Sequence, residues 1–283
     1  MKMLSAVLIF APPSGKKMNF FPNYFEVACK EIIFAGKMDY QKGRFLVNAK
    51  TEKPLDEGFD FYAPQSFVDE SGRRLLFGWL GSGELTYQMN QPSVKGGWLH
   101  SLTIPRELFV CGGKLHQRPA NELKALRKEE EAIEYRGKMA INRGTTSLEM
   151  LTENLRGQTV SFDFGAVLKI CYKKEHQCIK IQRKKWDSPG YDEKVVTLAS
   201  LDNIHVFLDR STSEVFINNG EMSFTSKTYF DANTEIQIFS EGRIKIKTWI
   251  LEVFQMNAKF TDDEWLLIFQ QRTQSGLSVR KWC

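Results

Sequence analysis

The chain has 283 residues, of which 42% are hydrophobic and 26% are charged, and its formal net charge is +5. This composition is typical of a globular protein with a substantial core, and it excludes a disordered chain and a membrane protein. The 39 basic and 34 acidic residues are interspersed, so the positive excess is too small and too scattered to indicate a nucleic-acid surface.

The cysteines and histidines form no metal-binding or disulfide pattern. The five cysteines include no C-x-x-C pair, and the four histidines lack the spacing of metal ligands. An odd, sparse set of cysteines indicates reduced thiols and a cytoplasmic location. We therefore expect no metal and no cofactor. The residues concerned are Cys29, Cys111, Cys171, Cys178, Cys283, His100, His116, His176 and His205.

Residues 4–11 form an apolar run behind Lys2, and two interpretations fit it. A charged residue before a short apolar run is typical of a secretory signal peptide. A buried strand that ends at the Pro-Pro-Ser-Gly turn of residues 12–15 explains the same apolar run equally well. No apolar run approaches the roughly 20 residues that a membrane-spanning helix needs, so we expect no membrane partner.

Short strands separated by turns are predicted throughout residues 1–115. Residues 69–72, Asp-Glu-Ser-Gly, form the turn of a predicted hairpin. The even spacing is typical of either a propeller or a sandwich. The expected strands are residues 7–10, 25–28, 32–35, 44–47, 66–68, 75–80 and 98–104.

Residues 116–138 change in character and are strongly charged. Pro119 and Asn121 can begin a helix, and three apolar residues would lie roughly on one face of it: Leu123, Leu126 and Ile133. We expect a solvated linker here.

Residues 139–254 show the clearest strand pattern of the chain, with apolar and polar residues in alternation. Asn219-Gly220 between two alternating runs is the strongest short hairpin signal. One apolar and one polar face per strand predicts two sheets packed face to face. The expected strands are residues 159–164, 178–182, 204–208, 213–217, 221–225, 235–239, 244–246 and 249–254.

Residues 255–283 match no pattern that indicates a particular structure. Residues 265–271 are largely apolar and fit one more strand or a short helix equally well.

Three segments between residues 55 and 108 combine carboxylates with aromatic residues. They are LDEGFDFYAPQSF at 55–67, RRLLFGW at 73–79 and GWLHSLTIPREL at 97–108. Flat aromatic faces and carboxylates suit a sugar, which offers apolar C–H faces and many hydroxyl donors. Strands with core aromatics are the alternative explanation.

The three segments resemble glycoside hydrolase family 32, the β-fructofuranosidases, in order and spacing. The pattern is nearest to the bacterial sucrose-6-phosphate hydrolases within that family. Residues 119–127 and 207–220 resemble the family's connection and its C-terminal module. The resemblance implies an all-β fold, with the last blades of a five-bladed β-propeller at 1–115, a linker at 116–138, a C-terminal β-sandwich at 139–254 and a tail at 255–283.

The catalytic carboxylates of the family have no counterpart in this sequence. Retaining glycosidases use two carboxyl groups about 5 Å apart. The family supplies its nucleophile from a W-M-N-D-P-N-G motif, a further aspartate from R-D-P and its acid/base from E-C-P. Residues 89–92 and 26–29 are the nearest strings, and neither matches. We therefore expect no catalytic residue here and a C-terminal fragment that is inactive alone.

The resemblance also implies which residues face a substrate. Asp56, Asp60, Tyr62 and Trp79 would lie at or near the propeller funnel, with Trp98 as a weaker candidate. Core packing is the alternative for both tryptophans.

Two further charged sets are expected to be structural. Arg106 and Glu107 should tie the blade to the linker. Asp209, Arg210 and Glu214 border a hairpin in a module without a catalytic role in the family.

The implied partners are sucrose or sucrose 6-phosphate and the missing N-terminal half of the enzyme, with no nucleic acid and no membrane. A non-catalytic sugar-binding or interaction module, and a decayed gene product with a persistent sandwich, remain as alternative functions.

Overall fold

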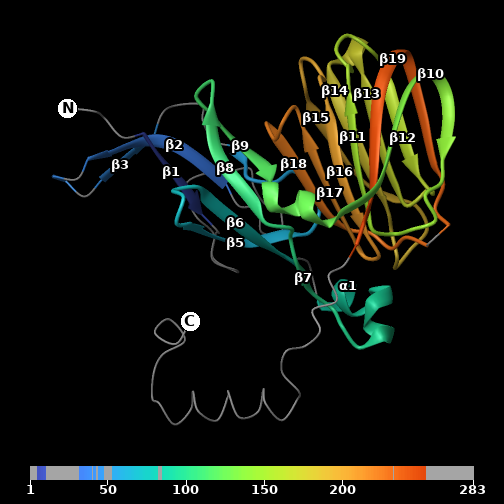
Figure 1. The fold of residues 1–283 in the computed structure, drawn as a ribbon. Coiled ribbons are helices and arrows are strands. Elements are labelled where there is room, and N and C mark those ends of the chain that lie inside the picture. Colours follow the sequence, from blue (N-terminus) through green and yellow to red (C-terminus); the bar gives the residue numbers. More distant parts are fainter. Residues whose placement is uncertain are drawn as a thin grey trace. The chain divides into compact units, whose positions relative to one another are not determined.

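The computed structural model describes residues 5–10, 32–39, 41–42, 44–47, 53–81, 85–231 and 233–252. The chain divides into two units, Met1–Leu251 and Glu252–Cys283, and the first contains the elements below (Figure 1). The strand expected at 25–28 and the element expected at 265–271 lie outside the described residues. Within the described stretches of the chain, no helix is long and apolar enough to cross a membrane.

The first sheet is antiparallel and contains β1 (Ser5–Phe10), β2 (Ile32–Asp39), β3 (Arg44–Val47) and β4 (Lys53–Pro54). Its strand order is β1-β2-β3, with β4 paired to β2. The strands expected at 7–10, 32–35 and 44–47 are confirmed.

The second sheet contains β5 (Phe61–Val68), β6 (Arg74–Leu80), β7 (Ser101–Leu102), β8 (Arg106–Cys111) and β9 (Lys114–Pro119), in the order β5-β6-β8-β9 with β7 on β6. The expected hairpin between β5 and β6 is confirmed. Its turn is closed by Asp69, whose Oδ1 accepts hydrogen bonds from the backbone N–H groups of Ser71 and Arg73 at 3.0 and 2.8 Å.

The strand expected at residues 98–104 is wrong in extent. Only Ser101–Leu102 pairs with β6, and the chain re-enters the sheet as β8 after Pro105. The β8–β9 hairpin was not expected. Its turn is Gly112-Gly113 with φ of 57° and 76°, a glycine pair that favours a two-residue hairpin turn because both positions need positive φ.

A short helical insert separates β6 from β7. It consists of α1 (Leu85–Met89) and the 3-10 helix η1 (Pro92–Gly96), which begins with proline and ends at Gly97 in the left-handed conformation.

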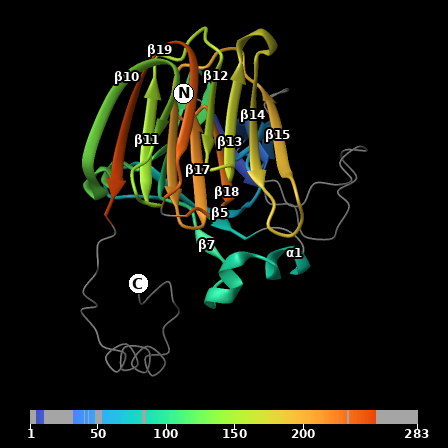
Figure 2. The same cartoon turned by 90° about the vertical axis from the view of Figure 1, so that its right-hand side faces the viewer.

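The third sheet contains ten strands in the order β15-β14-β13-β12-β19-β11-β16-β17-β18, with β10 on the free side of β19. Its bounds are β10 Arg127–Ile141, β11 Leu148–Glu153, β12 Val160–Phe164, β13 Leu168–Lys173, β14 Cys178–Lys184, β15 Tyr191–Thr197, β16 Ile204–Asp209, β17 Thr212–Ile217, β18 Met222–Lys227 and β19 Ile236–Leu251. In Figure 2, β10 and β15 lie at the two lateral sides of these strands.

Strand β19 joins the two layers of the sandwich. Residues 236–240 of β19 pair with β12, and residues 245–250 pair with β11. The three short strands expected between 235 and 254 are therefore one long strand. The core lies between the β12–β15 layer and the β11–β16–β17–β18 layer, with Phe162, Ile170 and Ile181 from one and Met150, Val206 and Phe224 from the other. The alternating apolar residues face inward, as expected.

The solvated linker expected at 116–138 is wrong over most of its length, because residues 116–119 lie in β9 and residues 127–138 lie in β10. Only a 3-10 helix, η2 (Asn121–Leu126), follows β9, and β10 begins at Arg127. Every second or fourth residue of β10 is partly or fully buried, and its partner along most of its length is β19. A charged run can form such an edge strand because one of its faces meets water.

Candidate functional site

The segment from Asp56 to Asp60 lies against the free edge of β18. The backbone N–H groups of Glu57 and Phe59 donate to the carbonyl oxygens of Ser223 and Thr225 at 2.8 and 2.9 Å. Gly58 permits this approach, because a Cβ there would lie 2.1 Å from the Thr225 carbonyl oxygen. The segment therefore continues the sandwich sheet beyond its last strand and joins the second sheet to the sandwich.

Asp56 is buried and its carboxylate is fully engaged by protein donors. It accepts hydrogen bonds from the Thr225 backbone N–H at 2.8 Å, the Thr225 hydroxyl at 2.6 Å and the Ser223 hydroxyl at 3.0 Å. The Gly58 N–H donates at 2.8 Å, and Arg106 Nη1 donates at 3.0 Å. A sugar hydroxyl could reach this carboxylate only if the contact with β18 opened.

Arg106 is the centre of this contact and is 0% exposed. Its guanidinium donates to Glu214 at 2.6 Å and 3.1 Å, to Asp56 at 3.0 Å and to Gln117 at 3.0 Å. The rings of Phe61 and Phe216 lie 5.2 and 5.0 Å from the guanidinium carbon. Burial alone would lower the pKa of Arg106, but the Glu214 and Asp56 carboxylates raise it above its ordinary value.

Arg106 and Glu107 make structural contacts, but these do not tie the blade to a linker, because Gln117 and Arg118 belong to β9 of the same sheet. Both side chains contact residues that follow position 115, because Arg106 donates to Gln117 and Glu107 pairs with Arg118 at 2.8 Å. The carboxylate partners of Arg106, however, lie in the Asp56 segment and in β17. Arg106 therefore holds the second sheet to the sandwich as well as to the segment that follows β8.

The charged residues beside the β16–β17 hairpin have the structural roles expected of them. The second oxygen of Glu214 accepts the backbone N–H of Ile104 at 2.7 Å. Asp209 accepts hydrogen bonds from the Ser147 hydroxyl at 2.9 Å and from the backbone N–H of Arg210 at 2.8 Å.

The β17–β18 hairpin, which is confirmed, meets β9 at its tip. Gly220 has φ of 86°, and a Cβ there would lie 1.7 Å from the Gln117 carbonyl oxygen. The Gln117 N–H donates to the Gly220 carbonyl oxygen at 2.9 Å. The Asn-Asn-Gly turn thus brings backbone against backbone, as only glycine permits.

Asp60 is also buried and belongs to a second group of contacts with the sandwich. It accepts the Lys227 backbone N–H at 2.7 Å and pairs with Arg183. Arg183 lies between the rings of Phe59 and Trp186, at 4.6 and 4.5 Å. Burial raises the pKa of Asp60, and the positive charge of Arg183 opposes that shift.

Both aspartates therefore hold the second sheet against the sandwich, and both are buried, at 6% exposure for Asp56 and 1% for Asp60. We do not retain direct sugar contact as their role. The partners that engage them lie far away in the chain, 169 residues away for Asp56 and Thr225, so local sequence patterns did not reveal them.

Tyr62 and Trp79 lie opposite each other on β5 and β6. Trp79 is 41% exposed and its ring lies 5.1 Å from that of His100. A bulge follows Tyr62, and Ala63 there has φ of 44°. Trp98 is 43% exposed, so neither tryptophan is a core residue. The structure brings Tyr62 and Trp79 together as a paired aromatic surface.

Trp98 lies beside a buried lysine that sequence analysis did not identify. The Lys227 Nζ is 5.0 Å from the centre of the Trp98 ring and donates to the Ser101 hydroxyl at 2.7 Å. Burial lowers the pKa of Lys227 to about 8. The sequence contains one signal for Lys227, because it lies on β18 two residues after Thr225 and four after Ser223. Both of those side chains face the second sheet, so alternation along the strand places Lys227 on the same side.

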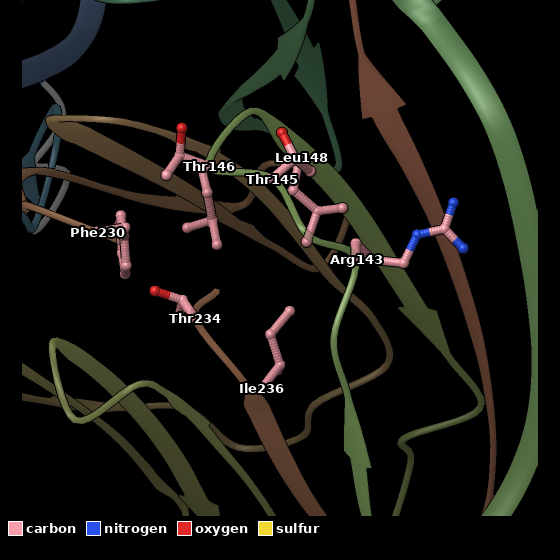
Figure 3. Close-up of a pocket in the computed structure, with 8 residues that line it drawn as sticks. Arg143, Thr145, Thr146, Leu148, Phe230, Thr234 and Ile236 are labelled. Atoms are coloured by element: carbon pink, nitrogen blue, oxygen red, sulfur yellow. The ribbon is translucent and has the colours of Figure 1, made fainter. Parts of the chain in front are cut away.

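A small hollow lies at one end of the sandwich, between residues of both layers (Figure 3). Thr145, Leu148, Phe230 and Ile236 are among the residues that line it. Its volume of about 10 Å³ is room for about one water molecule. It is too small for a sugar ring. Among the described residues, no three His, Cys, Asp or Glu side chains converge in a way that could hold a metal ion.

Comparison with sequence families gives two adjoining matches. The glycosyl hydrolases family 32 N-terminal domain matches residues 2–119, and the family 32 C-terminal domain matches residues 122–255. A sucrose-6-phosphate hydrolase of Bacillus subtilis is 30% identical over 254 residues, which is 87% of this chain and 51% of that protein. One from Salmonella typhimurium is 36% identical over 201 residues, which is 71% of this chain and 41% of that protein. The chain thus spans about half the length of the curated relatives that it matches.

Solved structures match over a similar span. A Bombyx mori β-fructofuranosidase in complex with sucrose has a TM-score of 0.71 at 20% identity, over 88% of this chain and 52% of that one. A sucrose-6-phosphate hydrolase of Lactobacillus gasseri has a TM-score of 0.68 at 21% identity, over 79% of this chain and 48% of that one. The expected fold class is confirmed: an all-β chain with the last blades of a propeller followed by a β-sandwich.

Proposed function

The chain belongs to glycosyl hydrolase family 32, and on that premise we propose that it forms the rear half of a β-fructofuranosidase. Its substrate would be sucrose or sucrose 6-phosphate, its mechanism retaining, and its location the cytoplasm. The observation that carries the proposal is the 254-residue match to a sucrose-6-phosphate hydrolase at 30% identity. We propose the division expected from the sequence, a partial propeller, a linker, a sandwich and a tail at 255–283, with the linker shortened to the segment between β9 and β10, which end at Pro119 and begin at Arg127.

The chain alone would be inactive under this proposal. A retaining glycosidase needs a nucleophile and an acid/base about 5 Å apart, and none of the three family motifs that supply carboxylates occurs in the sequence. Asp56 and Asp60 cannot replace them while the protein donors of the sandwich contact engage both carboxylates. The catalytic groups would come from a front segment, by which we mean the portion of the Bacillus subtilis relative ahead of its match to this chain.

Tyr62 and Trp79 are the residues that we propose to meet the sugar, with Trp98 as a third candidate. Aromatic faces pack against the C–H face of a sugar ring. Asp60 would act indirectly, because it anchors to the sandwich two residues before Tyr62. Asp56 would help in the same way through Arg106.

A chimera tests the proposed function. The front segment would be joined ahead of Met1, and release of reducing sugar from sucrose and sucrose 6-phosphate would be measured beside the purified chain alone. We expect hydrolysis by the chimera and none above background by the chain. Replacing Trp79 by alanine should lower kcat/KM of the chimera at least tenfold. A folded but inactive chimera would contradict the proposal, as would hydrolysis by the chain alone.

A non-catalytic sugar-binding module is a second candidate, and the exposure of Trp79 and Trp98 favours it. Both rings would report ligand binding through their fluorescence. Saturable quenching by sucrose in the chain alone, lost in Trp79→Ala, together with an inactive chimera, would support the binding module over the glycosidase.

A further inference from the structure

Lys227, the last residue of β18, is buried with few partners for its charge. It is 0% exposed, and a lysine is almost never fully buried unless it is paired. Among the described residues, the one side-chain acceptor of its Nζ is the Ser101 hydroxyl at 2.7 Å, although an ammonium group can donate three hydrogen bonds. Burial of a cation in such a place is costly, so packing alone does not explain this lysine.

The ring of Trp98 lies beside the buried ammonium group. The Lys227 Nζ is 5.0 Å from the centre of that ring, which is within the range of a cation–π attraction. Trp98 is 43% exposed, so packing covers only part of its side chain. The attraction acts over the face of the ring, so it fixes the orientation of the ring as well as its place.

Tyr229, two residues after Lys227, reaches the segment that carries Trp98. The hydroxyl oxygens of Tyr229 and Ser93 are 3.1 Å apart, and Tyr229 also donates to Gln91 Oε1 at 2.9 Å. The Ser93 carbonyl oxygen accepts the backbone N–H of Trp98 at 3.3 Å. The sandwich therefore contacts both the ring of Trp98 and the helical insert that precedes it.

The backbone of Lys227 is connected to the other two proposed sugar contacts. Its N–H donates to the Asp60 carboxylate at 2.7 Å, and Asp60 lies two residues before Tyr62. The Asp60 carbonyl oxygen accepts the backbone N–H of Gly81 at 3.2 Å, two residues after Trp79. One residue of the sandwich thus supports the whole set of aromatic side chains to which we assign the sugar.

We propose that Lys227 is a positioning residue for sugar binding, whose ammonium group holds the Trp98 ring in the orientation that packs against the substrate. The inference rests on the proposed function and gives the sandwich a part in it. Lys227 is fully buried, so it acts through Trp98 and not by contact with the sugar. The flat face of an aromatic ring packs on the C–H face of a sugar in one orientation, and a ring that turns away loses that contact.

The charge of Lys227 can be removed by titration, because burial lowers its pKa to about 8. Three charged groups surround it in a chain of contacts. Asp60 opposes the shift, Arg183 of β14 pairs with Asp60, and Asp192 of β15 pairs with Arg183. A signal from Trp98 that follows Lys227 should therefore change near pH 8.

The first test uses the full chain labelled with fluorotryptophan and observed by fluorine NMR. The resonance of Trp98 is the one that Trp98→Phe removes. We expect this resonance to be single in the wild-type chain at pH 7 and to shift with a midpoint near pH 8. In Lys227→Met it should be broadened or split and should not titrate there. Lys227→Arg should keep it single, because arginine retains a charge that stacks on aromatic rings, and should abolish the titration.

Lys169→Met is the matched control on the same sandwich. The Lys169 Nζ lies 5.2 Å from the centre of the Tyr191 ring, so the same change removes the same kind of contact elsewhere. It should leave the Trp98 resonance and its titration unchanged. If the resonance titrates equally in the wild-type chain and in Lys227→Met, or if Lys169→Met alters it as much, Lys227 does not position the ring.

The second test measures the kinetics of the chimera. Lys227→Met should raise KM for sucrose and sucrose 6-phosphate by about fivefold or more and leave kcat within about twofold, because a contact that is equally strong in the ground state and the transition state acts on KM. Lys227→Arg and Lys169→Met should both stay within about twofold of the unmodified chimera in KM and kcat.

The remaining outcomes separate this inference from the proposed function. An active chimera whose KM is unchanged by Lys227→Met overturns the inference and leaves the function. A fall in kcat and Tm without a change in KM would assign Lys227 a stabilising role only and would also overturn it. An inactive chimera combined with the expected behaviour of the Trp98 resonance overturns the proposed function and leaves the placement of Trp98 by Lys227.

Discussion

Replacing Arg106 by methionine should lower the free energy of unfolding by about 3–5 kcal/mol, the range for removing one partner of a buried ion pair. Methionine fills some of the space between Phe61 and Phe216 but donates no hydrogen bond. Glu214 then keeps the hydrogen bond from the Ile104 N–H at 2.7 Å and loses both hydrogen bonds from the guanidinium group. Asp56 loses less, because the Ser223 and Thr225 donors remain.

Urea and thermal unfolding followed by circular dichroism would measure the change. One kcal/mol shifts Tm by about 2–4 °C in a domain of this size, so Tm should fall by about 6 °C or more. The matched control is Arg118→Met, whose ion pair with Glu107 has 53% of the arginine side chain exposed and should contribute about 1 kcal/mol or less. Adding Glu214→Gln to Arg106→Met should recover some of the loss. Equal effects of the two arginine changes would refute the reasoning.

Three further predictions concern the same contact. Gly58→Ala should lower Tm by several degrees, because its Cβ would lie 2.1 Å from the Thr225 carbonyl oxygen, whereas Gly96→Ala meets only the Trp98 side chain at 3.4 Å; equal melting of the two variants would contradict the close approach. Lys227 has a pKa lowered to about 8 by burial, so between pH 8 and about 10.4 the unfolded chain binds more protons than the folded chain, and the free energy of unfolding should rise with pH across that window. Lys227→Met should remove this rise, as measured by urea unfolding at several pH values. An unchanged dependence of the free energy of unfolding on pH would exclude Lys227 as its source. Residues 127–254 expressed alone should unfold cooperatively, because their core is self-contained. Glu214→Gln should raise the urea midpoint of this segment, because Glu214 there has no Arg106 to pair with. A lower midpoint would show that the unpaired Glu214 does not destabilise the segment.

Alternation and turn chemistry were sufficient to predict β12, β14, β16, β17 and β18, because these signals depend on neighbours within a few residues, but β11, β13 and β15 were not expected. The Asn219-Gly220 hairpin is an example, since its turn requires positive φ whatever the rest of the chain does. The same local patterns predicted the β5–β6 hairpin from its Asp-Glu-Ser-Gly turn.

The site could be predicted only incompletely, because its partners are distant in sequence. A buried aspartate that accepts backbone and hydroxyl bonds looks the same in sequence as one that awaits a sugar. Asp56 and Thr225 are 169 residues apart, and nothing near Asp56 indicates the edge of β18. The charged β10 was not predicted as a strand for a similar reason, since its stabilising partner is β19, more than 90 residues later.

The position of β19 has a consequence for synthesis on the ribosome. The strands of the two sandwich layers are connected by hydrogen bonds only through β19, since β12 and β11 each pair with it in the described sheet and not with each other. Translation adds about 5–20 residues per second, so residue 148 is made about 5–20 seconds, and residue 235 about 1–3 seconds, before β19 is complete at residue 251. The nascent layers must wait with their apolar sides uncovered, and a nascent-chain chaperone would be needed longest in that interval. A chain that ends before β19 would therefore lack the strand that joins the two layers by hydrogen bonds.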